Sequence, residues 1–591
     1  MHHLRTLIPF LRPYRWATLA GLVLVAFSNV FDVLVPLVLG RAIDALGEAD
    51  MTRTTILGYA FLIVGLALLA GTARFGMRVL LNGMSRHIEN DLRNAFFDHL
   101  LRLDATFYGG TRTGDLMSRA TNDVGAVRMA VGPAVMYLVN TAFSTGLALF
   151  FMTRISGRLT LLALIPLLLM PPVVIVAGRI IHERFERIQE HLGVLSTMVQ
   201  ENLSGVRIVR AYAQEAAQER EFDDLNRTYF DKNMDLARTS ALFHPTLSLL
   251  AAAAMLIVFW FGGRLVMSNN ITPGDFVAFL FYLAKLSWPM IALGWVINLF
   301  QRGAASMGRL NTVFSALPRV TPPAHPTHLS KVKGEVEFRD VWFRYPGTER
   351  DVLQGINFRI PTGQTTAIVG PTGSGKSTVV ALLARRYDPT AGAVTLDAES
   401  LPTISFEQLR QAIAVVPQEA FVFSETIADN LALGLPRDAH ARDDIVEAAR
   451  MARFDEAIAL FPRGFETRLG ERGVNLSGGQ RQRATLARAI ARNPRVLILD
   501  DALSAVDTHT ETEILENLKQ VLAGRTAVII SHRVSAVMNA DQILVLDQGI
   551  IVERGTHAQL IARGGLYATL LRRQLLEESV EGELANSSEP A

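Results

Sequence analysis

The chain has 591 residues, of which 50% belong to the hydrophobic set and only 19% are charged. Soluble domains carry about 25% charged residues, so this composition argues against a purely soluble protein. The net charge of +2 is too balanced to indicate a nucleic-acid-binding protein. The absence of cysteine excludes disulfides, thiolate metal sites and a cysteine nucleophile.

The first half of the chain reads as a membrane domain. Residues 1–15 are basic and partly amphipathic, and we expect them to lie as a helical elbow on the inner membrane face. Residues 16–315 contain apolar segments near the roughly 20 residues that a helix needs to cross a bilayer. The sequence therefore predicts an all-α transmembrane domain with six spans, namely Trp16–Gly40, Ile56–Leu81, Val131–Thr153, Leu159–Ala177, Leu247–Met267 and Phe276–Leu299.

The connections between these spans predict the orientation. Three arginines precede the first span, six lie between spans two and three, and nine arginines or lysines lie between spans four and five. Positive charge marks the cytoplasmic side, so we expect both termini to be cytoplasmic. The two long basic connections have a helical pattern, and we expect the spans to continue through them as rigid arms.

Polar side chains inside the spans have several readings. Charge at membrane depth is costly, so ionisable residues there indicate a substrate cavity, an ion pair between helices or a solvated position. The sequence leaves these alternatives open for Asp32, Arg74, Arg78 and Lys285. Amides in membrane helices usually form hydrogen bonds between helices, which is the role expected of Asn29, Asn140 and Asn298.

The second half reads as a soluble domain. The prolines at 322, 323 and 326 break any helix and indicate a linker over residues 316–333. Short aliphatic runs then alternate with helix-length segments, which predicts an α/β domain over residues 334–575 with a mainly parallel sheet and an antiparallel edge. Residues 576–591 are acidic and poor in aromatics, so we expect a disordered tail.

The strongest motif is a phosphate-binding loop. The sequence GPTGSGKST follows the predicted strand TTAIV and precedes an apolar helix, which is the context this pattern requires. Its glycines let backbone N–H groups wrap phosphates, Lys376 reaches the β- and γ-phosphates, and Ser377 is a ligand for Mg²⁺. The matching acidic residue is Asp500, at the end of the strand VLILD. The loop comprises Gly370, Pro371, Thr372, Gly373, Ser374, Gly375, Lys376, Ser377 and Thr378.

A second motif, LSGGQRQR, lies between the phosphate loop and Asp500. Ser477 is placed to cap a helix, and the following glycines let the backbone approach a γ-phosphate. On these motifs the chain resembles a half-transporter of the ATP-binding cassette (ABC) exporters, of the B-family-like or type IV kind that exports drugs or lipids. The resemblance implies that the signature acts on ATP held by a partner subunit, through Leu476, Ser477, Gly478, Gly479 and Gln480.

The resemblance implies further roles. ATP and Mg²⁺ would be bound, with Tyr345 stacking on adenine, Gln418 linking the Mg²⁺ site to the membrane arms, and His532 contacting the γ-phosphate. The segments Phe107–Val124 and Val199–Glu215 resemble the two cytoplasmic connections whose short helices dock on nucleotide domains, the second on the partner's. A further loop, which we call the D-loop, would cross the dimer interface with Ser504, Ala505, Val506 and Asp507.

One position departs from the family pattern. The family places glutamate after the Mg²⁺-site aspartate, as general base or water positioner, whereas this chain has Asp501. The shorter side chain withdraws the carboxylate by roughly 1 Å, and misplacement on that scale can cost about 10²-fold in rate. The resemblance therefore favours a heterodimer, in which this chain's own ATP site is slow and its signature serves an active site on the partner.

The sequence thus predicts an ATP-driven exporter of hydrophobic or amphipathic compounds in the bacterial plasma (inner) membrane. Expected partners are a second half-transporter, membrane lipids and the transported compound, with no nucleic acid. A homodimeric lipid or glycolipid flippase has the same motifs, and an ATP-gated channel or regulatory subunit also fits them. A soluble cassette ATPase of DNA repair or translation conflicts with the six apolar segments.

Overall fold

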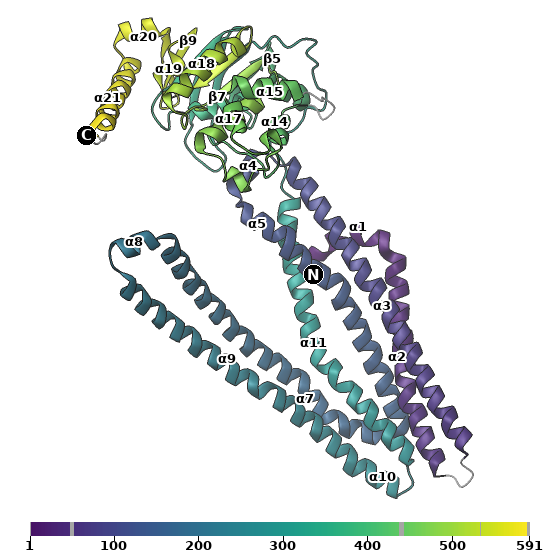
Figure 1. Cartoon of the computed structure of the whole chain (residues 1–591). Helices are drawn as coiled ribbons and strands as arrows, with labels where there is room; N and C mark the ends of the chain where they lie inside the picture. Colours follow the sequence, from purple (N-terminus) through teal and green to yellow (C-terminus); the bar gives the residue numbers. More distant parts are fainter. Residues whose placement is uncertain (1, 48–51, 436–441, 532, 588–591) are drawn as a thin grey trace. The chain divides into compact units, whose positions relative to one another are not determined.

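The computed structural model describes residues 2–47, 52–435, 442–531 and 533–587. The chain forms two compact units (Figure 1). The first unit comprises Met1–Arg102 and Arg112–Ala316, and the second comprises Leu103–Thr111 and Leu317–Ala591. The first unit ends at Ala316, one residue after the predicted end of the transmembrane domain at residue 315.

The first unit is built from long helices. Short 3₁₀ turns at His2–Leu7 and Arg12–Tyr14 flank α1 where the amphipathic elbow is expected. The helix α7 packs along both α9 and α11, and α2 packs along α3. The helices are α1 (Ile8–Leu11), α2 (Arg15–Leu46), α3 (Arg53–Arg102), α5 (Thr113–Ser118), α6 (Val124–Met129), α7 (Val135–Ser204), α8 (Val206–Ala211), α9 (Glu215–Ile257), α10 (Gly263–Met267) and α11 (Pro273–Phe314), with π-helical turns at Arg119–Asp123, Ala130–Ala134 and Val258–Gly262.

Helices of this unit are long and apolar enough to cross a membrane. Among the described residues, four continuous helical stretches meet this criterion: Leu4–Leu46, Arg53–Arg102, Thr113–Ser204 and Glu215–Met267. The third stretch contains two of the predicted spans, separated where Ser156 leaves helical geometry (φ −160°, ψ 111°). The sixth predicted span lies within α11. These helices support a membrane domain, and the count of six spans stays a prediction.

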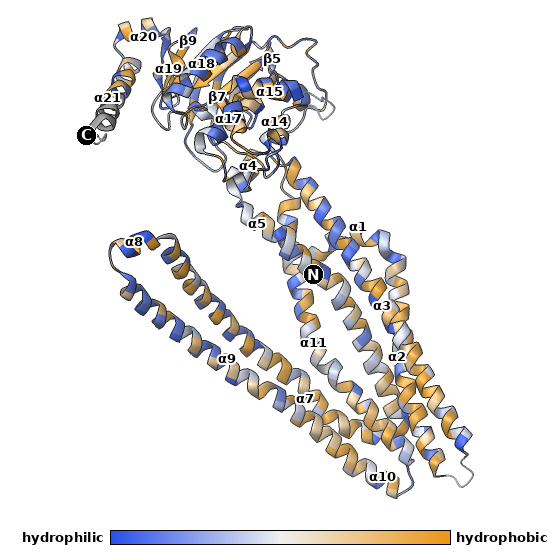
Figure 2. Cartoon of the chain, viewed as in Figure 1, coloured by the Kyte–Doolittle hydropathy of each residue, from blue (hydrophilic) through white to orange (hydrophobic). Residues whose placement is uncertain are grey.

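The helices also continue beyond the predicted spans. The helix α3 extends 21 residues past Leu81, and α7 and α9 form a long hairpin whose tip carries α8. Figure 2 shows the α9 arm of this hairpin changing from largely hydrophobic near α10 to largely hydrophilic near α8. A water-exposed helix needs a polar surface, so this gradient is typical of a membrane helix that continues into the aqueous phase.

Polar side chains inside the first unit pair between helices. Lys285 of α11 donates to the carboxylate of Asp32 on α2, and Arg74 of α3 lies 3.4 Å from the same carboxylate. Among the alternatives that the sequence leaves open for these three residues, the structure therefore shows an ion network between helices. The predicted amide contact is also confirmed, because Asn29 Nδ2 donates to Asn140 Oδ1 at 2.9 Å. By contrast, Arg78 and Asn298 are exposed.

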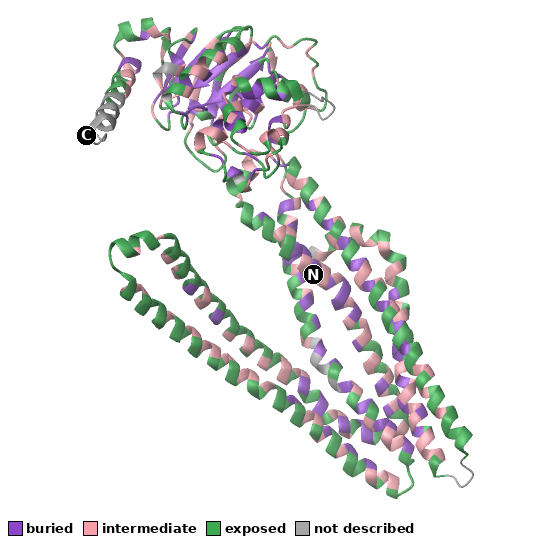
Figure 3. Ribbon diagram, viewed as in Figure 1, coloured by how far each residue is buried: buried purple, intermediate pink, exposed green. Residues whose placement is uncertain are grey.

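The second unit contains two β-sheets, and the buried residues concentrate in them (Figure 3). The six-stranded sheet has the order β10-β9-β3-β8-β7-β6, in which only the edge strand β10 is antiparallel to its neighbour. This confirms the predicted mainly parallel sheet with an antiparallel edge. The second sheet is antiparallel, in the order β2-β1-β4-β5. The strands are β1 (Val336–Phe343), β2 (Leu353–Ile360), β3 (Thr365–Val369), β4 (Ala391–Leu396), β5 (Glu399–Ser400), β6 (Ile413–Val416), β7 (Val496–Asp500), β8 (Thr526–Ile530), β9 (Gln542–Asp547) and β10 (Ile550–Gly555).

The parallel strands position the site. Every residue of β7 and β8 is buried, as expected for strands covered on both faces. Because parallel strands end at the same edge of a sheet, β3, β7 and β8 bring the phosphate loop, Asp500 and Ser531 to one edge. The helices of this unit are α4 (Ala105–Gly110), α12 (Lys376–Leu383), α13 (Phe406–Ala412), α14 (Ile427–Ala432), α15 (Arg442–Met451), α16 (Asp455–Ala459), α17 (Gly478–Ala491), α18 (Thr508–Leu522), α19 (Val534–Val537), α20 (His557–Arg563) and α21 (Leu566–Ser587).

A short segment from the membrane half packs in the second unit. Leu103–Thr111 is assigned by the sequence to the transmembrane domain, but its contacts group it with the second unit. Asp104 caps α4 by accepting from the backbone N–H of Phe107 at 3.4 Å. The same carboxylate accepts the N–H groups of Arg319 and Val320 at 2.7 and 2.9 Å. One aspartate thus joins the connection between the second and third predicted spans to the predicted linker.

The end of the chain differs from its predicted state. Residues 576–591 are expected to be disordered, but α21 continues to Ser587, and 588–591 lie outside the described residues. The segment LLEESVEGEL is rich in leucine and glutamate, which are good helix formers. Local helix propensity therefore outweighs the effect of the acidic composition.

Candidate active site

The phosphate-binding loop connects β3 to α12, as the motif predicts. Gly370 has φ +150°, and a Cβ atom there would lie 2.0 Å from the carbonyl oxygen of Leu546 on the neighbouring strand β9. Gly373 has φ +80°, and a Cβ built there meets no heavy atom of the described residues within 4 Å. The loop thus packs against the sheet at its start and has free space at its tip, as a backbone cradle for an anion requires.

Lys376 is held against this loop. Its side chain is buried, and Nζ donates to the carbonyl oxygens of Gly370 and Pro371, both at 2.8 Å. Burial lowers the pKa of the Lys376 ammonium, and the carboxylates of Asp501 and Asp500 act in the opposite direction. A cation with two nearby carboxylates and a glycine-rich loop is suited to binding the phosphates of a nucleotide that carries a divalent cation.

Asp500 lies next to the start of α12. Its side chain is buried at the end of β7, and Ser377 Oγ donates to Asp500 Oδ1 at 3.3 Å. Burial raises the pKa of Asp500 and the neighbouring Asp501 acts in the same direction, while the hydrogen bond from Ser377 opposes them. A buried carboxylate beside a hydroxyl supplies the oxygen ligands that Mg²⁺ prefers, so these residues fit that ion.

A cavity of about 220 Å³ brings most of the predicted residues together. Gln418, an exposed residue after β6, also lines it. Gly370 and Pro371 line a different cavity, of about 380 Å³, beside α21, and Ser374 of the loop is buried. The cavity of 220 Å³ is lined by Val352, Thr372, Gly373, Gly375, Lys376, Ser377, Thr378, Gln418, Asp500, Asp501 and Ile530.

Tyr345 lies beside this cavity. Its hydroxyl is 3.1 Å from Thr378 Oγ1, which ties it to the first turn of α12. Its ring makes edge contacts with Phe343 and Tyr387, at centroid distances of 4.9 and 5.4 Å. Tyr387 follows α12 in the sequence and was not among the predicted residues. Stacking of Tyr345 on adenine stays a prediction.

Asp501 occupies an unusual backbone position. Its φ is +50°, a left-handed conformation that aspartate and asparagine adopt more readily than residues with longer side chains. Its N–H donates to the carbonyl of Ile530 at 2.8 Å, and its carbonyl accepts from Ser504 Oγ at 3.0 Å. The backbone of Asp501 is therefore held on both sides, and the side chain lines the cavity from a defined position.

The signature begins helix α17 as predicted. Ser477 accepts from the N–H of Gln480 at 3.2 Å, and Gln480 Oε1 accepts from the N–H of Ser477 at 2.9 Å, which forms a capping box. Ser477 is exposed, whereas Leu476 is buried. Among the described residues that line the 220 Å³ cavity, none belongs to the signature. The described residues of the signature therefore do not contribute to the cavity at the chain's own phosphate loop.

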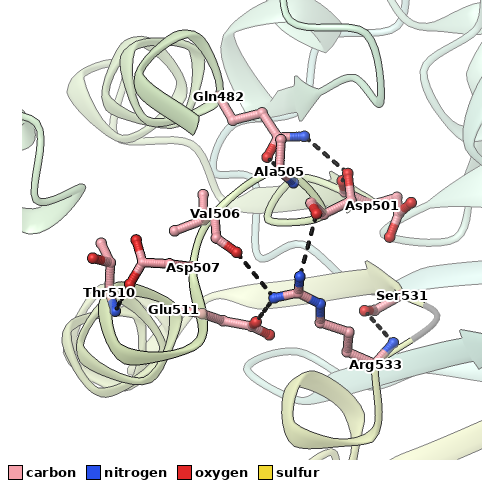
Figure 4. Close-up of polar contacts among 10 residues, drawn as sticks. Gln482, Asp501, Ala505, Val506, Asp507, Thr510, Glu511, Ser531 and Arg533 are labelled. Carbon is pink, nitrogen blue, oxygen red and sulfur yellow. Dashed lines mark hydrogen bonds and ion pairs between the residues drawn. The ribbon is translucent and has the colours of Figure 1, made fainter. Parts of the chain in front are cut away.

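The D-loop, Ser504–Asp507, lies beside α17 (Figure 4). Asp507 caps α18 by accepting from the backbone N–H of Thr510 at 2.9 Å, and hydrogen bonds from Thr510 hold the pKa of this carboxyl below its usual range. Sequence reasoning missed three residues here: Gln482 and Arg533, which form hydrogen bonds to the loop, and Glu511, which binds Arg533. Two of them lie next to predicted residues in the sequence, because Gln482 follows the signature and Arg533 follows His532. His532 itself lies outside the described residues.

Comparisons with known proteins agree with this geometry. The profile of the ABC transporter transmembrane region matches residues 18–290, and the ABC transporter profile matches residues 353–504. The probable multidrug resistance ABC transporter ATP-binding/permease protein YheI of Bacillus subtilis (strain 168) is 40% identical over 575 residues, which are 97% of this chain and 98% of that protein.

Two further relatives are named as a multidrug resistance-like protein and as a lipid flippase. The multidrug resistance-like ATP-binding protein MdlA of Escherichia coli (strain K12) is 36% identical over 572 residues, covering 97% of this chain and 96% of that protein. The ATP-dependent lipid A-core flippase of Syntrophus aciditrophicus (strain SB) is 34% identical over 527 residues, covering 89% and 87%. With a helical membrane domain followed by an α/β ATPase domain, the chain belongs to the ABC transporters as a type IV exporter, an ATPase coupled to transmembrane transport.

Proposed function

We propose that this chain is one half of an exporter that uses ATP to move hydrophobic or amphipathic compounds across the bacterial plasma membrane by alternating access. The observation that carries the proposal is that, among the described residues, no signature residue lines the cavity at the chain's own phosphate loop. A complete ATP site then requires the signature of a second chain. Closure of two such sites would draw the membrane arms together, which is a rigid-body switch driven by ATP binding.

The side chains of the cavity have defined roles in this proposal. Lys376 would bind the β- and γ-phosphates, Tyr345 would stack on adenine, and Ser377, Asp500 and Gln418, which line the cavity, would hold Mg²⁺. Mg²⁺ held there would supply positive charge to neutralise the phosphates. The fixed spacing of Ser377 and Asp500 and the backbone cradle of the loop orient the terminal phosphate without moving.

Asp501 makes this site slow. Its carboxylate would position or deprotonate the attacking water, with His532 contacting the γ-phosphate. Because the backbone of Asp501 is held by Ile530 and Ser504, the side chain cannot recover the missing methylene by moving toward the phosphate. We therefore propose a heterodimer whose fast site combines this chain's signature with the phosphate loop and glutamate of a different half-transporter.

The surface of the first unit supports a second chain. At the tip of the α7–α9 hairpin, Leu203, Ile208 and Tyr212 are 71%, 65% and 74% exposed. Exposed apolar side chains on an aqueous surface indicate a docking site. The resemblance to the exporter family assigns this tip, within Val199–Glu215, to the partner's nucleotide domain.

The orientation and cargo remain parts of the proposal. The arginine-rich connections favour cytoplasmic N- and C-termini. The names of the relatives refer to multidrug resistance and to a lipid A-core flippase, which favours a drug or a lipid as the cargo of this chain. A homodimeric lipid or glycolipid flippase is the second candidate, favoured by the similarity to the lipid A-core flippase.

Purification of the chain alone and together with the product of any adjacent half-transporter gene tests the assembly. We expect ATPase activity from the pair and little from the lone chain, with export of drugs or lipids by the pair in proteoliposomes. Robust ATPase activity of the lone chain would overturn the heterodimer. In the pair, replacing the partner's catalytic glutamate should leave only the slow hydrolysis of this chain's own site, whereas Asp501→Asn should have a much smaller effect.

A further inference from the structure

The D-loop is bound on one side by the signature helix. Gln482 of α17 is buried, its Oε1 accepts from the N–H of Ala505 at 2.9 Å, and its Nε2 donates to Ser504 Oγ at 3.0 Å. The start of the same helix approaches the loop closely, because a Cβ atom on Gly479 would lie 2.8 Å from the carbonyl oxygen of Ala505. The signature and the D-loop are therefore fixed to each other by backbone contact and by one carboxamide.

Arg533 binds the D-loop from the other side (Figure 4). Its guanidinium donates to the carbonyl oxygens of Val506 and Ser504, at 3.1 and 3.3 Å, and forms an ion pair with Glu511 of α18. Glu511 is only 2% exposed. A buried carboxylate requires a partner, and a planar guanidinium can serve it and two carbonyl groups at once, which a lysine ammonium does poorly.

The same arginine is tied to the edge of the sheet. Its backbone N–H donates to Ser531 Oγ at 2.9 Å, directly after β8. The last residue of β8, Ile530, accepts the N–H of Asp501, whose carbonyl accepts from Ser504 Oγ. The D-loop, Asp501 and the end of β8 thus form one hydrogen-bonded network, and the chain passes from it directly into His532.

We propose that Arg533 is a positioning residue for ATP hydrolysis, which fixes the D-loop against the signature helix and the end of β8. Arg533 contacts the D-loop and Glu511, and it acts on the reaction through the loop. The inference rests on the proposed function in one respect, namely that the D-loop and signature complete an ATP site shared with a second chain. Loosening the loop would then lower the rate of hydrolysis while the chain's own phosphate loop keeps its affinity for ATP.

The test uses the assembled transporter in lipid nanodiscs, whether the second half is a copy of this chain or a different chain. Arg533→Lys keeps the charge that faces Glu511 but cannot satisfy both carbonyls. We expect kcat to fall about 10- to 100-fold, the effect of a displacement near 1 Å in a reacting site. The KM for MgATP and the binding of a fluorescent ATP analogue should stay within about twofold, and Tm should be unchanged.

Two further variants separate positioning from simple folding. Glu511→Gln removes the buried charge but keeps the shape, and it should lower kcat in the same way. The pair Arg533→Lys with Glu511→Gln should be no worse than the stronger single variant, because both act through one contact. The matched control is Arg450→Lys, which alters an exposed Arg–Glu pair with Glu447 in the same unit and should leave kcat unchanged.

The inference is wrong if Arg533→Lys and Glu511→Gln both keep kcat within twofold of the unmodified transporter. It is also wrong if kcat falls only in proportion to a loss of folded protein, measured by Tm and active-site titration. If Arg533→Lys does not fold, Glu511→Gln and Gln482→Leu decide the question. Failure of the proposed function is distinct, because the unmodified assembly would then have no coupled ATPase activity.

Discussion

Lengthening one side chain provides a direct test of why the chain's own ATP site is slow. The change Asp501→Glu adds one methylene and moves the carboxylate roughly 1 Å further into the cavity. The backbone of this residue is held by Ile530 and Ser504, so the added length extends the side chain toward the phosphate loop. We expect hydrolysis at this site to increase by about 10- to 100-fold, or about 1.4 to 2.7 kcal/mol of transition-state stabilisation.

The same change has a cost. Asp501 has φ +50°, and a longer side chain adopts the left-handed region less readily, at a cost below about 1–2 kcal/mol. The cost lowers the stability of the domain and shifts Tm by a few degrees, but it is small against the roughly 5–15 kcal/mol by which a native domain is stable. The variant should therefore fold and be faster, with a slightly lower Tm.

The assay must isolate this site. In the assembled transporter, the partner's catalytic glutamate is first replaced by glutamine, which leaves hydrolysis at this chain's phosphate loop as the measured activity. Asp501→Glu is then compared with the unmodified residue and with Asp501→Asn, which should remove the remaining activity. If Asp501→Glu stays within twofold of the unmodified residue in this background, side-chain length does not limit the site and the reasoning fails.

Three other changes test contacts that the structure shows. Gly274→Ala places a Cβ atom 1.9 Å from the carbonyl oxygen of a glycine on α2, so overpacking should cost about 1–3 kcal/mol and lower Tm in detergent. The control Gly65→Ala should not lower Tm, because a Cβ atom there meets nothing within 4 Å among the described residues. Equal shifts in Tm would contradict the close packing at Gly274. Asp104→Asn weakens the bonds that join the connection between the second and third predicted spans to the linker. Drug- or lipid-stimulated ATPase activity should therefore fall several-fold more than basal activity. A parallel fall in both activities would count against a coupling role. Asp32→Asn leaves Arg74 and Lys285 without their shared carboxylate and should lower Tm. Adding Lys285→Met should recover part of that loss in Tm. Additive losses would exclude the ion network as the cause.

Much of this protein could be predicted from local sequence. The phosphate loop, the aspartate after a buried strand and the capped signature helix all appear where their motifs place them, because each depends on residues adjacent in the chain. The apolar segments likewise predict long membrane helices, because hydropathy and length are local properties. The helical end of α21 differs from the prediction because helix propensity outweighs the effect of an acidic composition.

Only the tertiary structure decided which residues far apart in the chain contact each other. Asp32 and Lys285 are 253 positions apart, so no periodicity could show that they form an ion pair. Asp104 binds the linker across more than 200 positions, and Arg533 binds a loop from a different strand end. The sequence by itself determined which chemical groups the protein has and the local structure around them. The packing of strands and helices decided which of these groups meet, because a side chain's partners depend on the distances that folding creates.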